Sequence, residues 1–462
     1  MLSATSCPTA GGQGLKGGRT LADTPLVPTD SAVATAVDLP EALRPPTRRL
    51  SFGFILMLCL ANIALWFSMQ PVINYLLPEQ IIQLDPNRAH QGLYDGLILA
   101  FGAFFSIFSN TIGGALSDRT TGRWGRRSPW LIGSAVLSAG ALALLANAST
   151  IAMLFIGYGL YQLVVNGALA ALTAVVPDKA PDHQRGIVSA FVGLSLPVAI
   201  VLGAVVIGIV VTNDVTIGPL TITHVSLGYY ILALAFVIVT VAFIPTLRDT
   251  PLPRSAVAPF NLGAFLRSFW IDPRANPDFG LAWLVRFLVN FGWSSTLGSF
   301  LLLYLTNAVK VANPAGDAAI AQIVAVAMIL VSSVIGGWLS DRFRMRKVFV
   351  MSAAGLICVA LLLLAFFTSW TTTLIGGVIV GLGFGTYLAV DLALMTEVLP
   401  SQSDRGKDMG VFNIANALPN ALAPLLGGLI LSVWGSFQPL FIMAAVAVLL
   451  AALLVAPIKS VR

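Results

Sequence analysis

Amide and aromatic side chains recur at intervals of four residues inside long apolar stretches of this sequence. Two sets have this spacing: Asn62, Trp66, Gln70 and Asn74, and Tyr158, Gln162 and Asn166. Residues four apart lie on one face of a helix, so each set predicts a polar stripe on an apolar helix. Amides donate and accept hydrogen bonds and aromatic rings stack on apolar faces. This combination suits a neutral solute with many hydroxyl groups.

Two further apolar stretches, 280–306 and 372–399, carry side chains of the same kinds. Asn290 and Trp293 lie in the first stretch and Tyr387 lies in the second. Polar groups inside a bilayer are expensive and face a cavity or one another, so we expect all of these residues to line one binding cavity. Some of the amides can instead bond one helix to the next, and the sequence leaves both roles open.

The same two stretches carry a pair of opposite charges, Arg286 and Asp391. Each lies about eight residues from the same end of its stretch, which at 1.5 Å per residue is roughly 12 Å along the helix. The two side chains can therefore meet if their helices face one cavity, and the cation would keep the carboxylate ionised. A role in proton coupling and a static ion pair both remain open. Asp95 and Glu397 lie nearer the ends of their stretches, where we expect them to be solvated.

A different chemistry is concentrated in the polar turn 113–130, GGALSDRTTGRWGRRSPW. Its charged residues are Asp118, Arg119, Arg123, Arg126 and Arg127. The pattern returns at 336–347 as GGWLSDRFRMRK, where Asp341 and Arg342 occupy the places of the first acid and arginine. Two copies of one charged turn in a single chain predict two homologous halves.

Composition places these motifs in a membrane protein. The 462 residues are 57% hydrophobic and 10% charged, whereas soluble domains carry roughly a quarter charged residues. A helix crosses a bilayer in about 20 residues. The sequence predicts spans at 51–77, 92–116, 128–147, 150–176, 187–212, 226–246, 280–306, 318–339, 347–368, 372–399, 409–433 and 437–457. It therefore predicts an all-α membrane protein with twelve transmembrane helices in two six-helix, pseudo-symmetric halves.

Lysine and arginine in the short loops indicate the orientation of such a protein. One set of loops holds both charged turns together with Arg185 and Arg405, and the opposite set holds little beyond Arg88 and Lys310. This asymmetry predicts a multi-pass protein of the plasma membrane with both termini in the cytoplasm. It also accounts for the net charge of +6 without a nucleic-acid partner.

The predicted organisation has five parts. They are a disordered cytoplasmic tail at 1–48, a six-helix bundle at 49–246, a cytoplasmic linker at 247–279, a second bundle at 280–458 and a cytoplasmic C terminus at 459–462. In the linker, Asn261 is suited to cap a short helix whose apolar residues share one face. That pattern predicts an interfacial helix, with an irregular linker as the alternative.

The motifs resemble those of a known transporter superfamily. The duplicated G-x-L-S-D-R turn with its trailing arginines resembles the loop signature of the major facilitator superfamily, whose halves are parallel repeats of six spans. Three longer strings are similar to the glycoside–pentoside–hexuronide and sucrose-transporter branch. They are DRTTGRWGRRSPW at 118–130, PDKAPDHQRG at 177–186 and GKDMGVFNIANALPNALAP at 406–424.

The resemblance implies alternating access, with a central cavity lined by spans one, four, seven and ten. It also implies a gating latch in which Asp118 docks on the N terminus of the eleventh span, near Met409, and Asp341 docks near Gly186. The latch residues implied are Asp118, Arg119, Arg123, Arg126, Asp341 and Arg342. For the arginines, the alternative is that they only fix the topology.

Residues and resemblance together predict a secondary transporter that moves a small solute, a sugar or glycoside, coupled to protons and as a monomer. Ser106 and Asn110 stand where sodium-coupled permeases of that branch carry aspartates, which argues against a sodium site of that kind. An exporter of drugs or secondary metabolites on the same fold is the alternative. Cys7, Cys59 and Cys358 lack metal-ligand spacing, and we predict no metal, no cofactor and no enzyme activity.

Overall fold

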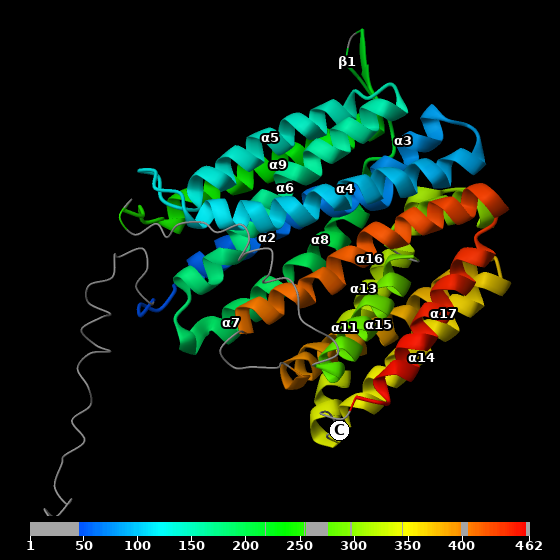
Figure 1. Ribbon diagram of the computed structural model, residues 1–462. Helices are drawn as coiled ribbons and strands as arrows, with labels where there is room; N and C mark the ends of the chain where they lie inside the picture. The colour runs from blue at the N-terminus through cyan, green and yellow to red at the C-terminus, as the bar shows by residue number, and fades with distance from the viewer. Residues whose placement is uncertain are drawn as a thin grey trace, which may run out of the picture. The chain divides into compact units, whose positions relative to one another are not determined.

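The computed structural model describes residues 46–217, 219–253, 255, 276–295, 298–343, 345–398 and 405–458. Most of the predicted tail and the predicted linker helix after Asn261 lie outside these residues. The first half contains α2 (Phe52–Pro71), η2 (Val72–Leu76), α3 (Leu77–Leu84), α4 (Arg88–Asp118), α5 (Ser128–Ala146), α6 (Ile151–Lys179), α7 (Asp182–Gly193), α8 (Ser195–Gly203), η3 (Ala204–Val210), β1 (Val215–Ile217), β2 (Leu220–Ile222) and α9 (His224–Leu247). The second half contains α11 (Pro277–Ser294), α12 (Leu301–Tyr304), η5 (Leu305–Val309), α13 (Pro314–Phe343), α14 (Arg346–Phe366), α15 (Trp370–Val398), α16 (Arg405–Trp434) and α17 (Gln438–Val455) (Figure 1). The η segments are π-helical.

Local sequence signals explain several helix boundaries. Ser51, Thr150 and Thr223 precede α2, α6 and α9, and each side-chain oxygen accepts a hydrogen bond from a backbone N–H three residues later. This is the usual role of an N-cap residue. Pro71 has no N–H to donate, and the helix changes to π geometry immediately after it.

Eleven helices among the described residues are long and apolar enough to cross a bilayer. They confirm the predicted spans other than 280–306. That span is divided between α11 and the pair α12 and η5, with non-helical backbone before Leu301. Gly292, Ser294 and Ser295 favour helix poorly, and Ser295 Oγ bonds back to the carbonyl of Phe291 at 2.7 Å. Irregular backbone at this depth is tolerated where protein buries it.

Helix pairing follows the same plan in both halves, as the duplicated turns predict. In the first half α4 packs on α6, α5 on α6 and α9, and α2 on α8 and α9. In the second half α13 packs on α15, α14 on α15 and α17, and α11 on α16 and α17. Each pair in the first list has its positional equivalent in the second. The predicted fold, two pseudo-symmetric bundles of six spans, is therefore confirmed.

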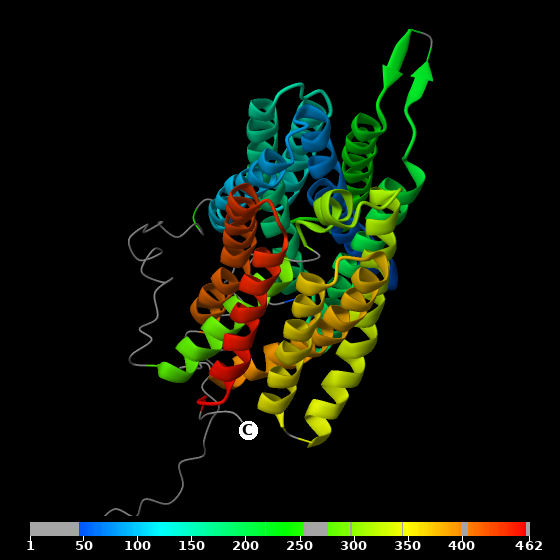
Figure 2. The same ribbon diagram turned by 90° about the vertical axis from the view of Figure 1, so that its right-hand side faces the viewer.

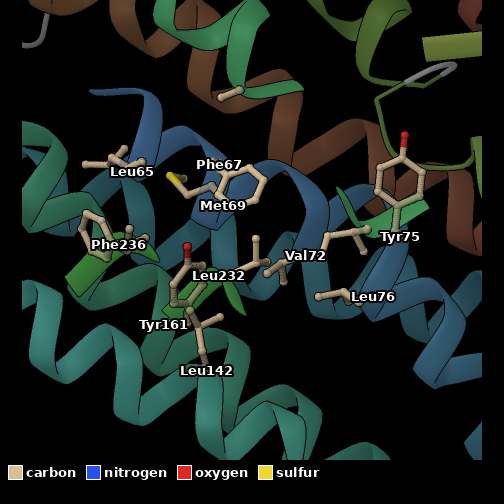
Figure 3. Packing of buried hydrophobic residues seen from close by; sticks show 14 of the residues in the cluster. Leu65, Phe67, Met69, Val72, Tyr75, Leu76, Leu142, Tyr161, Leu232 and Phe236 are labelled. Carbon is tan, nitrogen blue, oxygen red and sulfur yellow. The ribbon is translucent and has the colours of Figure 1, made fainter. Parts of the chain in front are cut away.

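A short hairpin is a feature that the sequence did not predict. Strands β1 and β2 pair antiparallel, with Val215 opposite Ile222, and extend beyond the helices (Figure 2). The hydrophobic core of the first half is a continuous cluster of buried side chains. Leu65 and Phe67 of α2, Leu142 of α5 and Phe236 of α9 belong to one buried cluster (Figure 3).

Candidate functional site

A small cavity lies between the two halves in the middle of the spans. Its volume is about 120 Å³, and Gln70, Asn74 and Gln322 supply its amide groups. Trp293 and Phe384 form an aromatic wall, with ring centroids 4.3 Å apart and planes 8° from parallel. The remaining lining consists of apolar side chains and one glycine, and none of the described lining residues is charged.

The structure brings three of the predicted binding residues to this cavity, namely Gln70, Asn74 and Trp293. Among the polar and aromatic residues of the lining, two were missed in the sequence, Gln322 of α13 and Phe384 of α15. Gln322 is a lone amide in an apolar helix, and that was the only signal it offered. Its side-chain oxygen accepts a hydrogen bond of 2.6 Å from the hydroxyl of Tyr75 in the other half.

Other residues that we predicted to line the cavity instead form contacts within or between helices, which is the alternative role given above. Asn62 donates to the carbonyl of Leu58 on its own helix, and Trp66 packs against the hydrophobic cluster of the first half. On α6 the three polar residues form a ladder. Gln162 Nε2 donates to Tyr158 Oη at 2.6 Å, and Asn166 Nδ2 donates to Gln162 Oε1 at 2.9 Å.

Arg286 and Asp391 are in direct contact, so their predicted meeting is observed. The other carboxylate oxygen accepts a hydrogen bond of 2.8 Å from Tyr387 Oη. Arg286 Nε donates to Asn416 Oδ1 at 2.7 Å, and Asn290 Nδ2 donates to the same oxygen at 3.2 Å. The side chain of Asp391 is 6% exposed. The result is a closed network joining α11, α15 and α16, and its coupling role stays a prediction.

Asp95 corrects one prediction. We expected a solvated carboxylate near a helix end, but Asp95 is 0% exposed. Both of its carboxylate oxygens lack a hydrogen-bond partner among the described residues. The reason is packing, because this end of α4 is covered by α3, α6 and α16. The side chain of Glu397 lies outside the described residues.

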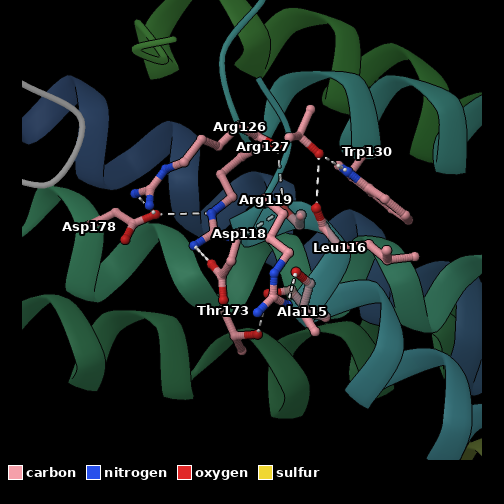
Figure 4. Close-up of polar contacts among 12 residues, drawn as sticks. Ala115, Leu116, Asp118, Arg119, Arg126, Arg127, Trp130, Thr173 and Asp178 are labelled. Carbon is pink, nitrogen blue, oxygen red and sulfur yellow. Dashed lines mark hydrogen bonds and ion pairs between the residues drawn. The ribbon is translucent and has the colours of Figure 1, made fainter. Parts of the chain in front are cut away.

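The first charged turn forms an ion-pair network within one half (Figure 4). Arg127 contacts Asp118 at 2.5 Å and Asp178 at 2.9 Å, and Arg126 contacts Asp178 at 3.1 Å. Burial by itself would lower the pKa of the Arg127 guanidinium, but the two carboxylates raise it above its ordinary value. In this structure Asp118 is therefore paired inside its own half. Its predicted docking on the start of α16 involves side chains outside the described residues.

Asp249 is a second partner of this turn that sequence reasoning missed. Its carboxylate accepts hydrogen bonds from the backbone N–H groups of Arg127 at 2.5 Å and Ser128 at 2.9 Å. It thus caps the N terminus of α5, where an acid is favoured. Gly125 makes room for it, with a φ of 90° and a Cβ position that Asp249 occupies. An acid far along the chain gives no local signal of such a cap.

The second charged turn is more open. Asp341 lies 4.0 Å from Arg346, and its side chain is 75% exposed. The guanidinium of Arg342 lies 6.0 Å from the ring centroid of Trp338, a distance suited to a cation–π contact.

The first charged turn has two further arginines. Arg119 donates to the carbonyl of Ala115 at 3.4 Å, and Arg123 is exposed. The gating role of these residues stays a prediction.

The two halves meet at the end away from the charged turns. Helices α4 and α16 cross there with glycines on both sides. A Cβ added to Gly428 would lie 2.5 Å from the carbonyl oxygen of Gly92 and 3.1 Å from the Cα of Gly96. Nearby, Asn307 Nδ2 donates to Gln91 Oε1 at 3.1 Å. From this crossing α16 diverges from α4 toward the charged turns (Figure 1).

Two repeated bundles of six spans, with a small cavity between them, are the organisation of one large class of membrane transporters. The profile of the Major Facilitator Superfamily matches residues 54–329 and 282–461, which together cover most of the chain. The chain therefore belongs to this family of transporters.

Curated relatives match only part of the chain. It is 37% identical over 107 residues to a probable 4-methylmuconolactone transporter of Cupriavidus pinatubonensis. This match covers 22% of this chain and 24% of that protein. It is 31% identical over 114 residues to the probable metabolite transport protein CsbC of Bacillus subtilis, which covers 25% of this chain and 24% of that protein. The matches thus span about a quarter of each relative.

Solved structures match over nearly the whole chain. A bacterial homologue of the human lysosomal transporter Spinster, inward-facing and occupied, has a TM-score of 0.67 at 16% identity, covering 87% of this chain and 95% of that one. The peptide transporter POT with alafosfalin has a TM-score of 0.69 at 15% identity, covering 92% and 97%. The nucleoside transporter NupG has a TM-score of 0.67 at 13% identity, covering 89% and 100%. At such identities the likeness shows the fold alone.

Proposed function

We propose that this protein is a secondary active transporter of a small neutral solute, a sugar or glycoside, which it moves by alternating access. The lining of the central cavity carries the proposal. Three amides and a stacked aromatic wall, without a charged side chain among the described lining residues, match hydroxyl groups on one side of a solute and an apolar ring face on the other. The motif resemblance to the sugar and glycoside branch supports the same solute class.

The proposed transporter lies in the plasma membrane as a monomer, with both termini in the cytoplasm. Under that orientation the crossing at Gly92 and Gly428 closes the extracellular side, and the charged turns lie on the cytoplasmic side. The structure then corresponds to an inward-facing state. The cavity of about 120 Å³ is below the usual range of about 300–1,000 Å³ for ligand sites, so we infer that it enlarges when a solute enters.

Proton coupling is the second part of the proposal, which makes the protein a symporter. Asp391 lies on α15 about one helical turn from Leu388, which lines the cavity, and its carboxylate contacts Arg286. If the two halves of the network separate during the cycle, the carboxylate loses its cation and takes up a proton instead. The alternative role is a static ion pair that holds α11 to α15.

A thermal-shift screen of the purified protein against sugars, glycosides, lactones and lipophilic drugs tests the solute class, because a ligand that binds the folded state stabilises it, and more so the tighter it binds. We expect stabilisation by a neutral sugar or glycoside, and accumulation of that compound in proteoliposomes when the outside is more acidic. Stabilisation by lipophilic cations alone would overturn the proposal. Accumulation that does not depend on the proton gradient would overturn its coupling part.

The second candidate is an exporter of drugs or secondary metabolites. It is favoured by the apolar remainder of the cavity wall, which includes Leu196, Ile200 and Val326, and such walls suit lipophilic solutes. Cells that produce the protein would then extrude a lipophilic dye faster than cells producing the Asp391→Asn variant. Equal dye retention in the two strains would exclude this candidate.

A further inference from the structure

Asp95 occupies an unusual position for a carboxylate. It lies on α4, about 10 Å along the helix from Arg88 at 1.5 Å per residue, and it is 0% exposed. Neither oxygen has a hydrogen-bond partner among the described residues. Gly92 and Gly96 flank it on the same helix, and both are pressed against the backbone of α16. The buried carboxyl group therefore lies beside the crossing of the two halves.

No cation in the described structure compensates the group. From α6 the facing ionisable side chain is Tyr158, close enough for an electrostatic interaction with the carboxylate. The described side chains of α16, residues 414–434, include no ionisable group. On α3, Glu79 is engaged by His224 at 2.7 Å. On α4 itself, Arg88 is exposed at the start of the helix, and Tyr94 is only partly buried.

An ionised carboxylate without a partner and without water is strongly disfavoured in a protein interior. A protonated carboxyl group carries no charge and tolerates the same surroundings much better. We propose that Asp95 is a proton-binding site that holds its proton while α4 and α16 are packed together and releases it when their separation admits water. The ligand is the proton itself, and the site is distinct from the network around Asp391.

This site links protonation to one conformation. If packing of α4 on α16 requires a proton on Asp95, then binding of that proton must favour the packed state by the same free energy. Acid outside would promote closure of this end, and alkali would promote its opening. The inference rests on the proposed alternating access, but it depends neither on the identity of the solute nor on the role of Asp391.

Infrared spectroscopy of the purified full-length protein tests the protonation. The carbonyl stretch of a protonated carboxylic acid is resolved from that of a carboxylate, and we expect the wild type to show such a band at neutral pH. Asp95→Asn should remove it. Asp182→Asn is the matched control and should retain it, because the Asp182 side chain is 91% exposed. A spectrum unchanged by Asp95→Asn would overturn the proposal. Asp95→Leu, also neutral, gives the same comparison if the amide variant does not fold.

Cysteine labelling tests the link to conformation. Leu431 of α16 contacts Gly92, so a cysteine at 431, in a protein whose native cysteines are replaced, reports separation of the two helices. We expect its labelling rate from the outside, measured relative to the Asp95→Asn variant at each pH, to rise several-fold with pH. An identical pH dependence in the two proteins would overturn the linkage. Neither experiment uses a solute, so failure of the sugar proposal leaves both results unaffected.

Discussion

The glycine crossing of α4 and α16 allows a quantitative test of how the two halves are held together. Gly428→Ala would place a methyl group 2.5 Å from the carbonyl oxygen of Gly92, whereas ordinary contacts begin at 3.4 Å. The obstacle is backbone on both sides, since the Cα of Gly96 lies only 3.1 Å away. No rotamer change can relieve this overlap, so the helices must separate by roughly 1 Å or store the strain.

The expected cost follows from measurements on overpacked cores, which lose about 1–3 kcal/mol. If that cost falls only on the state in which the two helices touch, the ratio of packed to separated molecules drops about 5- to 150-fold. Gly355→Ala is the control. It makes the same change in a helix of the same half, but its Cβ would meet nothing within 4 Å. Any gain in helix propensity, up to about 1 kcal/mol, is common to both variants.

Spin labels at Arg88 on α4 and Val433 on α16, both exposed, would report the distance between the two helices at their crossing, measured by pulsed electron paramagnetic resonance. We expect Gly428→Ala to populate a longer distance that is rare in the wild type and in Gly355→Ala. A distribution identical to the wild type, in a variant of normal thermal stability, would refute the idea that this crossing is rigid and sets the conformational balance.

The remaining predictions concern the polar sites. Gln70→Ala should weaken solute affinity several-fold or more, because a lost buried hydrogen bond costs about 1–3 kcal/mol; equal affinity in binding assays would remove Gln70 from the site. Asp391→Asn should abolish uphill accumulation in proteoliposomes and retain solute exchange, whereas a static pair predicts loss of protein that is partly restored by neutralising Arg286 as well. Asp118→Asn should shift the protein toward inward-open states and slow transport while membrane insertion stays normal. Cysteine accessibility from the cytoplasmic side measures this shift, and unchanged accessibility together with normal transport would count against the latch.

Much of the fold could be predicted because it depends on properties that are local in the sequence. Apolar runs of the length of a bilayer predict spans, and the repeated turns at 113–130 and 336–347 predict two similar halves. The break before Leu301 and the π segment after Pro71 could not be predicted in the same way. Each depends on a few residues whose effect on the backbone is set by neighbouring helices.

The sequence could predict those contacts of the candidate site that depend on how far along its helix each residue lies. Arg286 and Asp391 were expected to meet because they lie at equal depth, and they do. Exposure was not predictable from depth. Asp95 lies near a helix end and is nevertheless completely buried, because helices from both halves pack against this part of α4. The partners of Asn416 could not be predicted either. It accepts hydrogen bonds from two residues of α11, and the sequence of its own helix does not indicate which helix it faces.

The two ends of the protein are held by different interactions, and this difference bears on how it can alternate. The crossing of α4 and α16 is a backbone contact between glycines, which has no charge to rearrange and is either made or broken. At the opposite end, Arg127 binds two acids within one half, and one of them, Asp118, remains 58% exposed. An exposed acid of this kind can exchange its partner for a helix terminus at little desolvation cost. The end at the glycine crossing is thus suited to a two-state closure and the charged end to a change of partners, and the buried Asp95 lies beside that crossing.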